Sequence, residues 1–353
     1  MNLQTPLKER LDSYPRLALA EYPTPLEFLP RLSAELDRPV YVKRDDEIGP
    51  GGGGNKTRKL EYLMAEALEC GMRKVVTFGG LQSNHARLTA AAARRCGLKA
   101  HLFYFERRPK RLAGNLLLNQ VLGARMHFIP LGESGSGMTV ETTSRLVHWL
   151  ARLQVGRHYF IPVGGHSWRG CLGYVRAAWE IDEQARQLGI QQACIGLAAG
   201  SGGTLAGMMA GLTLIDSPLR LLGIDVGKLW KAFPASIARL ANELIAHLSV
   251  EPAPPPFRPE EVPMIEETYV GERYGVPSPL GMETLRRLAR LEGLLLDPVY
   301  TAKAFSGLLD WAALSGERGA TQAKFLPGLE PGQPLIFLHT GGLPALFAFE
   351  GLR

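Results

Sequence analysis

Short apolar runs alternate with amphipathic segments along most of the chain. Runs rich in β-branched and aromatic residues, such as 74–78 and 193–198, predict buried strands, and segments with apolar residues at helical spacing, such as 57–70 and 83–95, predict helices. The same patterns place strands at 38–42, 100–105, 125–129, 158–163, 220–226 and 334–339, and helices at 114–122, 139–153, 174–187, 204–215, 280–292 and 302–315. The alternation predicts an α/β fold with mostly parallel, open twisted sheets flanked by helices.

Length and composition suit a globular protein of two domains. The chain has 353 residues, of which 46% are hydrophobic and 21% are charged. Its net charge of +6 is spread along the chain, so we expect no nucleic-acid partner. The four cysteines, at 70, 96, 171 and 194, form no CxxC pair. We therefore expect no metal site and no disulfide framework, and we expect a reducing, cytoplasmic compartment.

One uncharged stretch, Gln187–Ile215, is long enough that a membrane-spanning helix has to be considered. It holds a doubled GxxxG at Gly203, Gly207 and Gly211, which is a pattern of packed membrane helices. However, its centre reads AAGSGG, and such a glycine cluster interrupts a spanning helix. A strand, a glycine loop and a helix explain the stretch better, so we expect no membrane segment.

The first loop with candidate chemistry carries a lysine after four glycines, Gly51 to Gly54. Lys56 then stands at the start of a predicted helix, where a lysine with a lowered pKa can form a Schiff base with an aldehyde. The alternative is a flexible glycine turn and a surface lysine. The loop is not a Walker A motif, because Asn55 separates Gly54 from Lys56.

Two further loops join a strand to a helix and suit anions. Ser83 and Asn84 stand at a predicted helix N-terminus, which favours a carboxylate or a phosphate, although an ordinary N-cap explains them equally. The loop at 200–204 presents successive backbone amides that suit a phosphate. A dinucleotide site is disfavoured, because Leu205 occupies the position of the third glycine of that fingerprint.

Two hydroxyl side chains complete the candidate set. Tyr300 follows a proline-fixed turn, and Thr340 follows the last predicted strand. Alone, the first is equally a core tyrosine and the second a helix cap. A lysine on a glycine loop, a phosphate nest and several hydroxyls are together the parts that bind a phosphorylated aldehyde, and pyridoxal phosphate is such a compound.

The motifs KRDD, GGNKTRKLEY, QSNHAR, GNLLLNQVLGA, GSGGT, EGLLLDPVYTAKA and HTGGLPALF follow one another along the chain. In this order the sequence resembles the family of D-cysteine desulfhydrase and 1-aminocyclopropane-1-carboxylate (ACC) deaminase. These are pyridoxal 5'-phosphate enzymes of the tryptophan synthase β-like fold, or fold type II. The resemblance implies a homodimer. It also implies a larger, discontinuous domain, 1–57 and 169–353, and a smaller α/β domain inserted at 58–168.

The resemblance also assigns roles to residues. Lys56 would carry the cofactor and act as the catalytic base, Asn84 would bind the phenolic oxygen of the cofactor, and Thr340 would lie beside its pyridine nitrogen. The phosphate would bind to Gly200, Ser201, Gly202, Gly203 and Thr204. A small amino-acid substrate would be bound by Ser83, Asn84, His85, Tyr274 and Tyr300, of which Ser83 and the two tyrosines are also candidate catalytic residues.

The branch of the family follows from two threonines. ACC deaminases typically carry Glu and Leu at the positions of Thr301 and Thr340, so the resemblance favours conversion of D-cysteine to pyruvate, hydrogen sulfide and ammonia. The alternatives are ACC deamination, a catalytically silent cofactor-binding protein, and elimination from a sulfonated or other β-substituted amino acid, which Arg107 or Arg108 would favour. The segments 105–111 and 164–170 depart from the family, and we expect Arg107, Arg108, His166 and Trp168 to alter the substrate pocket.

Overall fold

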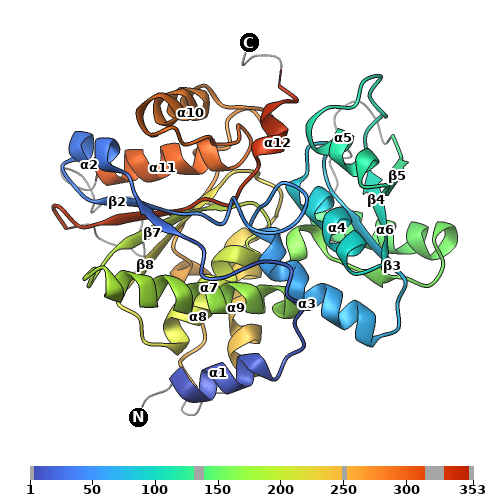
Figure 1. Cartoon of the computed structure of the whole chain (residues 1–353), viewed down its shortest axis with the longest axis horizontal. Coiled ribbons are helices and arrows are strands. Elements are labelled where there is room, and N and C mark those ends of the chain that lie inside the picture. Colours follow the sequence, from blue (N-terminus) through green and yellow to red (C-terminus); the bar gives the residue numbers. More distant parts are fainter. Residues whose placement is uncertain (1–3, 131–138, 249–252, 315–329, 350–353) are drawn as a thin grey trace.

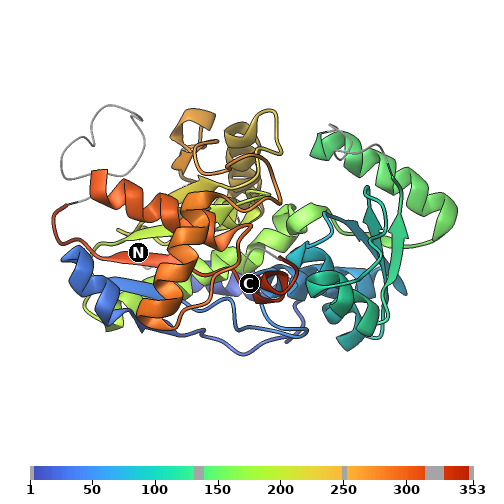
Figure 2. The same ribbon diagram turned by 90° about the horizontal axis from the view of Figure 1, so that it is seen from above.

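The computed structural model describes residues 4–130, 139–248, 253–314 and 330–349. Two sheets lie side by side, each with its own helices (Figures 1 and 2). The first helix, α1 (Gln4–Asp12), lies at the edge of the part that holds the larger sheet. The predicted α/β class with mostly parallel strands is confirmed, because a single strand, β1, pairs antiparallel within the described ranges.

The larger sheet has six strands in the order β1-β2-β10-β7-β8-β9. They are β1 (Leu26–Phe28), β2 (Val40–Lys43), β7 (Cys194–Ala199), β8 (Arg220–Asp225), β9 (Met264–Ile265) and β10 (Leu335–Leu338). The last strand of the chain, β10, lies between β2 and β7, with Leu335 beside both Val40 and Cys194. Residues from both ends of the chain therefore meet at the centre of this sheet.

The smaller sheet has four parallel strands in the order β5-β4-β3-β6. They are β3 (Lys74–Phe78), β4 (Lys99–Tyr104), β5 (Arg125–Phe128) and β6 (Tyr159–Phe160). The helices α3 (Lys56–Glu69), α4 (Asn84–Arg95), α5 (Gly114–Val121) and α6 (Val140–Gln154) come from the same part of the chain. The domain boundaries at 57/58 and 168/169 remain a prediction.

Helices cover both faces of the larger sheet. On one face lie α7 (Trp168–Gln187), α8 (Gly203–Leu214) and α9 (Phe233–Leu248), and on the other α2 (Pro30–Leu36), α10 (Pro279–Glu292) and α11 (Thr301–Leu314). Neighbouring strand residues alternate between the two cores, since Ile336 packs with the first group and Phe337 with the second. A strand buried on both faces explains why its sequence is apolar without interruption.

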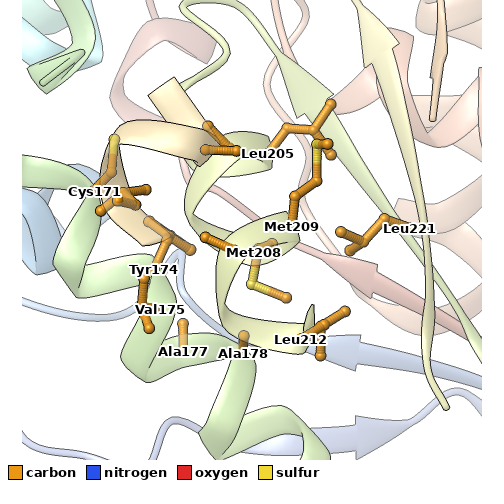
Figure 3. Close-up of a cluster of buried hydrophobic side chains, with 14 of the residues drawn as sticks. Cys171, Tyr174, Val175, Ala177, Ala178, Leu205, Met208, Met209, Leu212 and Leu221 are labelled. Carbon is orange, nitrogen blue, oxygen red and sulfur yellow. The ribbon is translucent and has the colours of Figure 1, made fainter. Parts of the chain in front are cut away.

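The doubled GxxxG lets α8 approach α7 closely inside the core (Figure 3). A Cβ on Gly207 would lie 2.6 Å from Tyr174 Cβ, and one on Gly211 would lie 2.6 Å from Ala178 Cβ. The helix α8 offers no surface to a second subunit, because it is buried on nearly all sides. No helix of the described segments is long and apolar enough to cross a membrane.

Two predicted elements differ from the structure. The helix expected at 174–187 begins already at Trp168, after Ser167, whose side chain accepts a hydrogen bond from the Gly170 N–H. The strand expected at 158–163 is limited to Tyr159–Phe160, because the chain then turns through Pro162 and through Gly164 at a positive φ of 66°. A short helix, α12 (Leu343–Leu346), follows the predicted glycine pair after β10.

Candidate active site

A cavity of about 250 Å³ lies at the carboxyl ends of the strands of both sheets. Loops after β2, β3, β4, β7, β8 and β10 contribute to its wall, as expected for ligand sites in α/β sheets. The sequence-predicted residues that line it are Lys56, Ser83, Asn84, His85, Gly200, Ser201, Gly202, Thr204, Tyr274, Tyr300 and Thr340. Gly203 begins α8 directly behind this wall. The structure thus brings the whole predicted set together.

Lys56 begins α3 at the end of the glycine loop and reaches the cavity wall. The loop requires glycine, because Gly53 has a φ of 69° and a Cβ there would collide with the Asp46 carbonyl oxygen. Lys56 Nζ donates a hydrogen bond to Asn55 Oδ1 at 2.9 Å. Burial lowers the pKa of Lys56 to about 7, and the positive charge of Lys59 acts in the same direction. At neutral pH a large fraction of the Lys56 amine is therefore unprotonated, which is the nucleophilic form.

The glycine loop is held in place from α4. Arg87 Nη2 donates a hydrogen bond to the Gly53 carbonyl oxygen at 2.9 Å, and Nη1 donates one to the Gly51 carbonyl oxygen. Arg87 Nε donates to Asn115 Oδ1 at 2.7 Å. Arg87 is fully buried. The loop that precedes Lys56 is therefore fixed rather than a flexible turn, and Arg87 is a functional residue that the sequence analysis did not identify.

The first turn of α8 is open to the cavity. Its N-cap residue, Gly202, has a φ of 77°, and no side chain caps the free N–H groups of the turn. A Cβ on Gly202 would lie 2.6 Å from Ile237 Cγ1, so the turn needs glycine for space as well as for conformation. Thr204 Oγ1 accepts a hydrogen bond from Asn55 Nδ2 at 3.2 Å. Uncapped N–H groups at a helix N-terminus suit a phosphate.

A second buried lysine lies behind this turn. Lys59 Nζ donates a hydrogen bond to the Gly164 carbonyl oxygen at 3.1 Å, and it lies 2.9 Å from the point where a Cβ on Gly203 would stand. Burial lowers the pKa of Lys59 below its ordinary value. Its position one turn after Lys56 on the same helix was the available sequence signal. Lys59 therefore places an amine directly behind the uncapped first turn of α8.

The first turn of α4 forms another wall of the cavity. Ser83 is an N-cap, since its Oγ accepts a hydrogen bond from the Ala86 N–H at 3.2 Å, and it also lines the cavity. Asn84 Oδ1 accepts a hydrogen bond from Asn115 Nδ2 at 2.9 Å. The cap hydrogen bond therefore leaves Ser83 in the cavity wall, and ligand binding at this helix end stays a prediction.

His85 is a neutral side chain in the same wall. Its Nε2 lies 2.9 Å from Thr77 Oγ1, which donates its own proton to the Ile161 carbonyl oxygen at 2.8 Å. Nε2 must then be the donor, so Nδ1 is unprotonated, and none of the described residues donates a hydrogen bond to Nδ1. Burial lowers the pKa of His85 well below its ordinary value, and the charge of Lys56 adds to this effect. His85 presents an acceptor, not a cation.

Two tyrosines, Tyr274 and Tyr300, form a further part of the wall. The hydroxyl groups of Tyr274 and Tyr300 are hydrogen-bonded to each other, and the ring centroids lie 6.0 Å apart. Tyr300 is positioned by Asp297, whose Oδ2 accepts hydrogen bonds from the backbone N–H groups of Val299 and Tyr300 at 2.9 and 3.0 Å. Burial raises the pKa of both tyrosines, so both are neutral at physiological pH.

The four residues expected to alter the substrate pocket do not line the cavity. His166 lies behind the phosphate loop with its ring centroid 4.9 Å from that of Trp230, and Trp168 stacks on His247 at 3.7 Å. Arg107 and Arg108 are exposed. None of these four lines the cavity, so the structure gives them no direct contact with a ligand there, and an effect of them on the substrate pocket stays a prediction. From the same segment Phe105 and Glu106 line it instead, and neither was predicted.

Comparisons with known proteins agree with this arrangement. The chain matches the model of a family described as pyridoxal-phosphate dependent enzyme over residues 17–325. The protein belongs to this family. It is 36% identical over 347 residues to a D-cysteine desulfhydrase of Salmonella schwarzengrund (strain CVM19633), covering 96% of this chain and 98% of the relative. Its cofactor is therefore pyridoxal 5'-phosphate, and it is an enzyme.

Comparison with solved structures identifies the fold. A crystal structure described as an ACC deaminase homologue is 35% identical, has a TM-score of 0.82, and covers 98% of this chain and 97% of its own. A fungal L-serine ammonia-lyase from Rhizomucor miehei shares the fold at 18% identity and a TM-score of 0.61, covering 93% of this chain and 97% of its own. The tryptophan synthase β-like fold, type II, is thus confirmed.

Proposed function

We propose that this pyridoxal-phosphate enzyme is a lyase that converts D-cysteine and one water molecule to pyruvate, hydrogen sulfide and ammonia. The observation that carries the proposal is the joining of Lys56, the uncapped turn of α8 and the tyrosine pair in one cavity. The D-cysteine desulfhydrases that the chain resembles over almost its whole length support the substrate. A catalytically silent protein is disfavoured, since it would not need the lowered pKa of Lys56.

The residues of the cavity fit the cofactor. Lys56 would hold it covalently, the N–H groups of the first turn of α8 and Lys59 would bind its phosphate, and Asn84 and Thr340 would contact its ring. When bound, pyridoxal phosphate supplies an electron-withdrawing ring that acidifies the Cα–H bond of an attached amino acid. An uncapped helix turn with a cation behind it and an amine with a lowered pKa are the parts that such a group needs.

Residues of this chain would orient the substrate and move its protons. The N-terminus of α4, with the Ser83 hydroxyl and the N–H groups of Asn84 and His85, would bind the substrate carboxylate. The Lys56 Nζ would take the Cα proton, because a pKa of about 7 suits a general base near neutral pH. Tyr300, backed by its hydrogen bond to Tyr274, would donate a proton to the departing sulfur.

Thr340, together with Thr301, favours D-cysteine over ACC, since ACC deaminases typically carry Leu and Glu at these two positions. Thr340 lines the cavity after β10, where we place the pyridine nitrogen, and a hydroxyl does not hold that nitrogen protonated as a carboxylate would. A weaker electron sink suits the loss of a good leaving group such as hydrosulfide, and suits less the opening of a cyclopropane ring. ACC deamination is the second candidate, and the structural similarity to the ACC deaminase homologue supports it.

The direct test of the proposal is a substrate panel for the purified holoenzyme. D-cysteine, L-cysteine and ACC would be supplied at saturation, with pyruvate and sulfide measured for the cysteines and keto acid for ACC. We expect pyruvate and sulfide in equal amounts from D-cysteine, little from L-cysteine and little keto acid from ACC, and Lys56→Ala should abolish turnover. Faster consumption of ACC than of D-cysteine would refute the assignment.

We also propose that the enzyme is a homodimer in a cytoplasmic, reducing compartment. Four exposed apolar side chains support a subunit contact. They are Leu117 and Val121 on α5, and Leu343 and Phe347 on and after α12, a helix that packs beside α5 (Figure 1). All four cysteines have free thiols, which supports a reducing, cytoplasmic compartment. Sedimentation at micromolar concentration should give a dimer, and Val121→Glu should weaken it while Leu188→Glu, on a distant exposed site, should not. A monomeric wild type would refute this part of the proposal.

A further inference from the structure

Glu106 places a carboxylate in the wall of the cavity. It follows β4 and accepts a hydrogen bond from the Leu81 N–H at 3.3 Å, on the loop that leads to α4. A Cβ on Gly80, in the same loop, would lie 3.3 Å from Tyr274 Cε1 and 3.9 Å from Glu106 Oε1. Glu106 therefore lies on the tyrosine side of the cavity, beside the loop between β3 and α4.

The cavity holds few charges. Of the described residues that line it, Lys56 alone has an amine and Glu106 alone has a carboxyl group, while His85, Tyr274 and Tyr300 are neutral. Two sets of free N–H groups face it, at the first turns of α8 and α4. The cofactor phosphate and the substrate carboxylate occupy those two sets under the proposed function. Lys56, the one amine of the described wall, holds the cofactor under the same proposal, so no cationic side chain of that wall remains to bind a third anion.

The pKa of Glu106 is raised above its ordinary value, although two of its neighbours act to lower it. Partial burial raises the pKa of Glu106, while the hydrogen bond from the Leu81 N–H and the positive charge of Arg273 act to lower it. An anionic group brought close to this carboxylate would be repelled, because the low dielectric of the cavity screens the two charges weakly.

We propose that Glu106 is a specificity residue, which makes the enzyme select amino acids with an uncharged β-substituent and reject those with an anion there. The proposal rests on the proposed function for the position of the substrate, with its carboxylate at α4 and its β-substituent on the tyrosine side. It excludes sulfonated amino acids as substrates, and the exposure of Arg107 and Arg108 agrees with that exclusion. A thiol, which is small and largely neutral, meets no such barrier.

The test compares two ligands of one shape that differ in a single charge, D-asparagine and D-aspartate. Their dissociation constants would be measured from the absorption change of the cofactor in the holoenzyme. We expect the wild type to bind D-asparagine at least tenfold more tightly, and tenfold corresponds to about 1.4 kcal/mol. Glu106→Gln keeps an oxygen acceptor for the Leu81 N–H and removes the charge, so the ratio should fall at least fivefold through tighter binding of D-aspartate.

The matched control is Glu272→Gln. It makes the same change of charge close to Tyr274 in the sequence, on a side chain that is 74% exposed, and it should leave the ratio unchanged. Equal affinities of the wild type for the two ligands, or an unchanged ratio in Glu106→Gln, would overturn the role of Glu106. If Glu106→Gln does not fold, the affinities of the wild type for D-asparagine and D-aspartate still test the proposal. If the ratio of the two dissociation constants behaves as expected but D-cysteine is not turned over, the proposed function is refuted and the role of Glu106 stands.

Discussion

Arg87 on α4 donates a hydrogen bond to the carbonyl oxygen of Gly53 at 2.9 Å, and so a fully buried guanidinium holds the loop that ends at Lys56. Burial lowers the pKa of Arg87 to about 10, which shows that the site is costly for a cation. The partners of the guanidinium are carbonyl and amide oxygens at Gly51, Gly53 and Asn115. The helix that presents Ser83 and Asn84 thereby also fixes the position of Lys56.

The first prediction is that Arg87→Met weakens the hold on the cofactor. Loss of the hydrogen bonds from a charged donor should reduce the free energy of unfolding by about 2–3 kcal/mol and the affinity for pyridoxal phosphate at least tenfold. Denaturant titration would measure the free energy of unfolding, and equilibrium dialysis would measure the affinity for pyridoxal phosphate. The control is Arg94→Met, because Arg94 also donates to two carbonyl oxygens, those of Leu122 and Gly123, but at an exposed site. Equal effects of the two substitutions would contradict the role of Arg87.

The second prediction concerns the pH at which the apoprotein takes up its cofactor. The pKa of Lys56 is lowered to about 7, chiefly by burial, so the unprotonated amine is scarce below pH 6 and dominant above pH 8. The rate of pyridoxal phosphate incorporation should rise with pH with a midpoint near 7. Stopped-flow absorbance at several pH values measures it. A midpoint near the ordinary lysine value of 10.5 would show that Lys56 is not desolvated.

The third prediction concerns acid stability. Burial alone would raise the pKa of Glu180, but its contacts with Arg58 and Lys43 hold that pKa at about 2, below the ordinary 4.5. A folded pKa below the unfolded one gives stability that is present above pH 4.5 and lost as the pH falls toward 2. Glu180→Gln should therefore lower the free energy of unfolding by roughly 3 kcal/mol at pH 7 and by much less at pH 3.

Denaturant unfolding of Glu180→Gln at the two pH values checks the acid-stability prediction. The control is Glu183→Gln, on the exposed side of the same helix, which should change stability little at either pH. A loss in Glu180→Gln that is the same at pH 3 and pH 7 would show that the carboxylate contributes through packing and not through its charge.

The fourth prediction tests the phosphate turn. Gly202→Ala strains the turn, because φ is 77° and the new Cβ meets Ile237, while Gly202→Asp adds a negative charge to the same strain. The aspartate variant should bind pyridoxal phosphate at least tenfold more weakly than the alanine variant, since a charge-assisted hydrogen bond contributes about 1.5–3 kcal/mol. Similar affinities of the two variants, measured by titration of the apoproteins, would show that the phosphate binds elsewhere.

Much of the fold was predictable because the buried strands are apolar. The strand β3 lies at Lys74–Phe78 as predicted, and the predicted helix at 57–70 differs from α3 by one residue at each end. The start of α7 was missed because it is rich in glycine. The helix needs glycine at Gly173, for example, because a Cβ there would collide with the Arg58 carbonyl oxygen of α3. This contact joins distant parts of the chain, so the local sequence does not reveal it. The helix α9 was also not predicted, although Ile237, Leu240 and Leu244 stand on one buried face.

The site was predicted unevenly, for a physical reason. Residues at the ends of strands and at helix starts, such as Lys56, Ser83 and Thr204, could be placed from the order of the elements. Lys59, Arg87 and Glu106 could not, because charged residues are ordinarily solvated and their burial depends on distant contacts. Lys59, for example, bonds to Gly164, which is 105 residues away in the chain.

The most direct test of the account is the position of the covalent cofactor. Borohydride reduction of the yellow holoenzyme, proteolysis and mass spectrometry would locate the pyridoxyl group on one lysine. Lys59 and Lys303 are true competitors, because both are buried and burial lowers the pKa of each. The account predicts the label on Lys56 and its absence from Lys56→Ala. A label on Lys59 or Lys303 would contradict it.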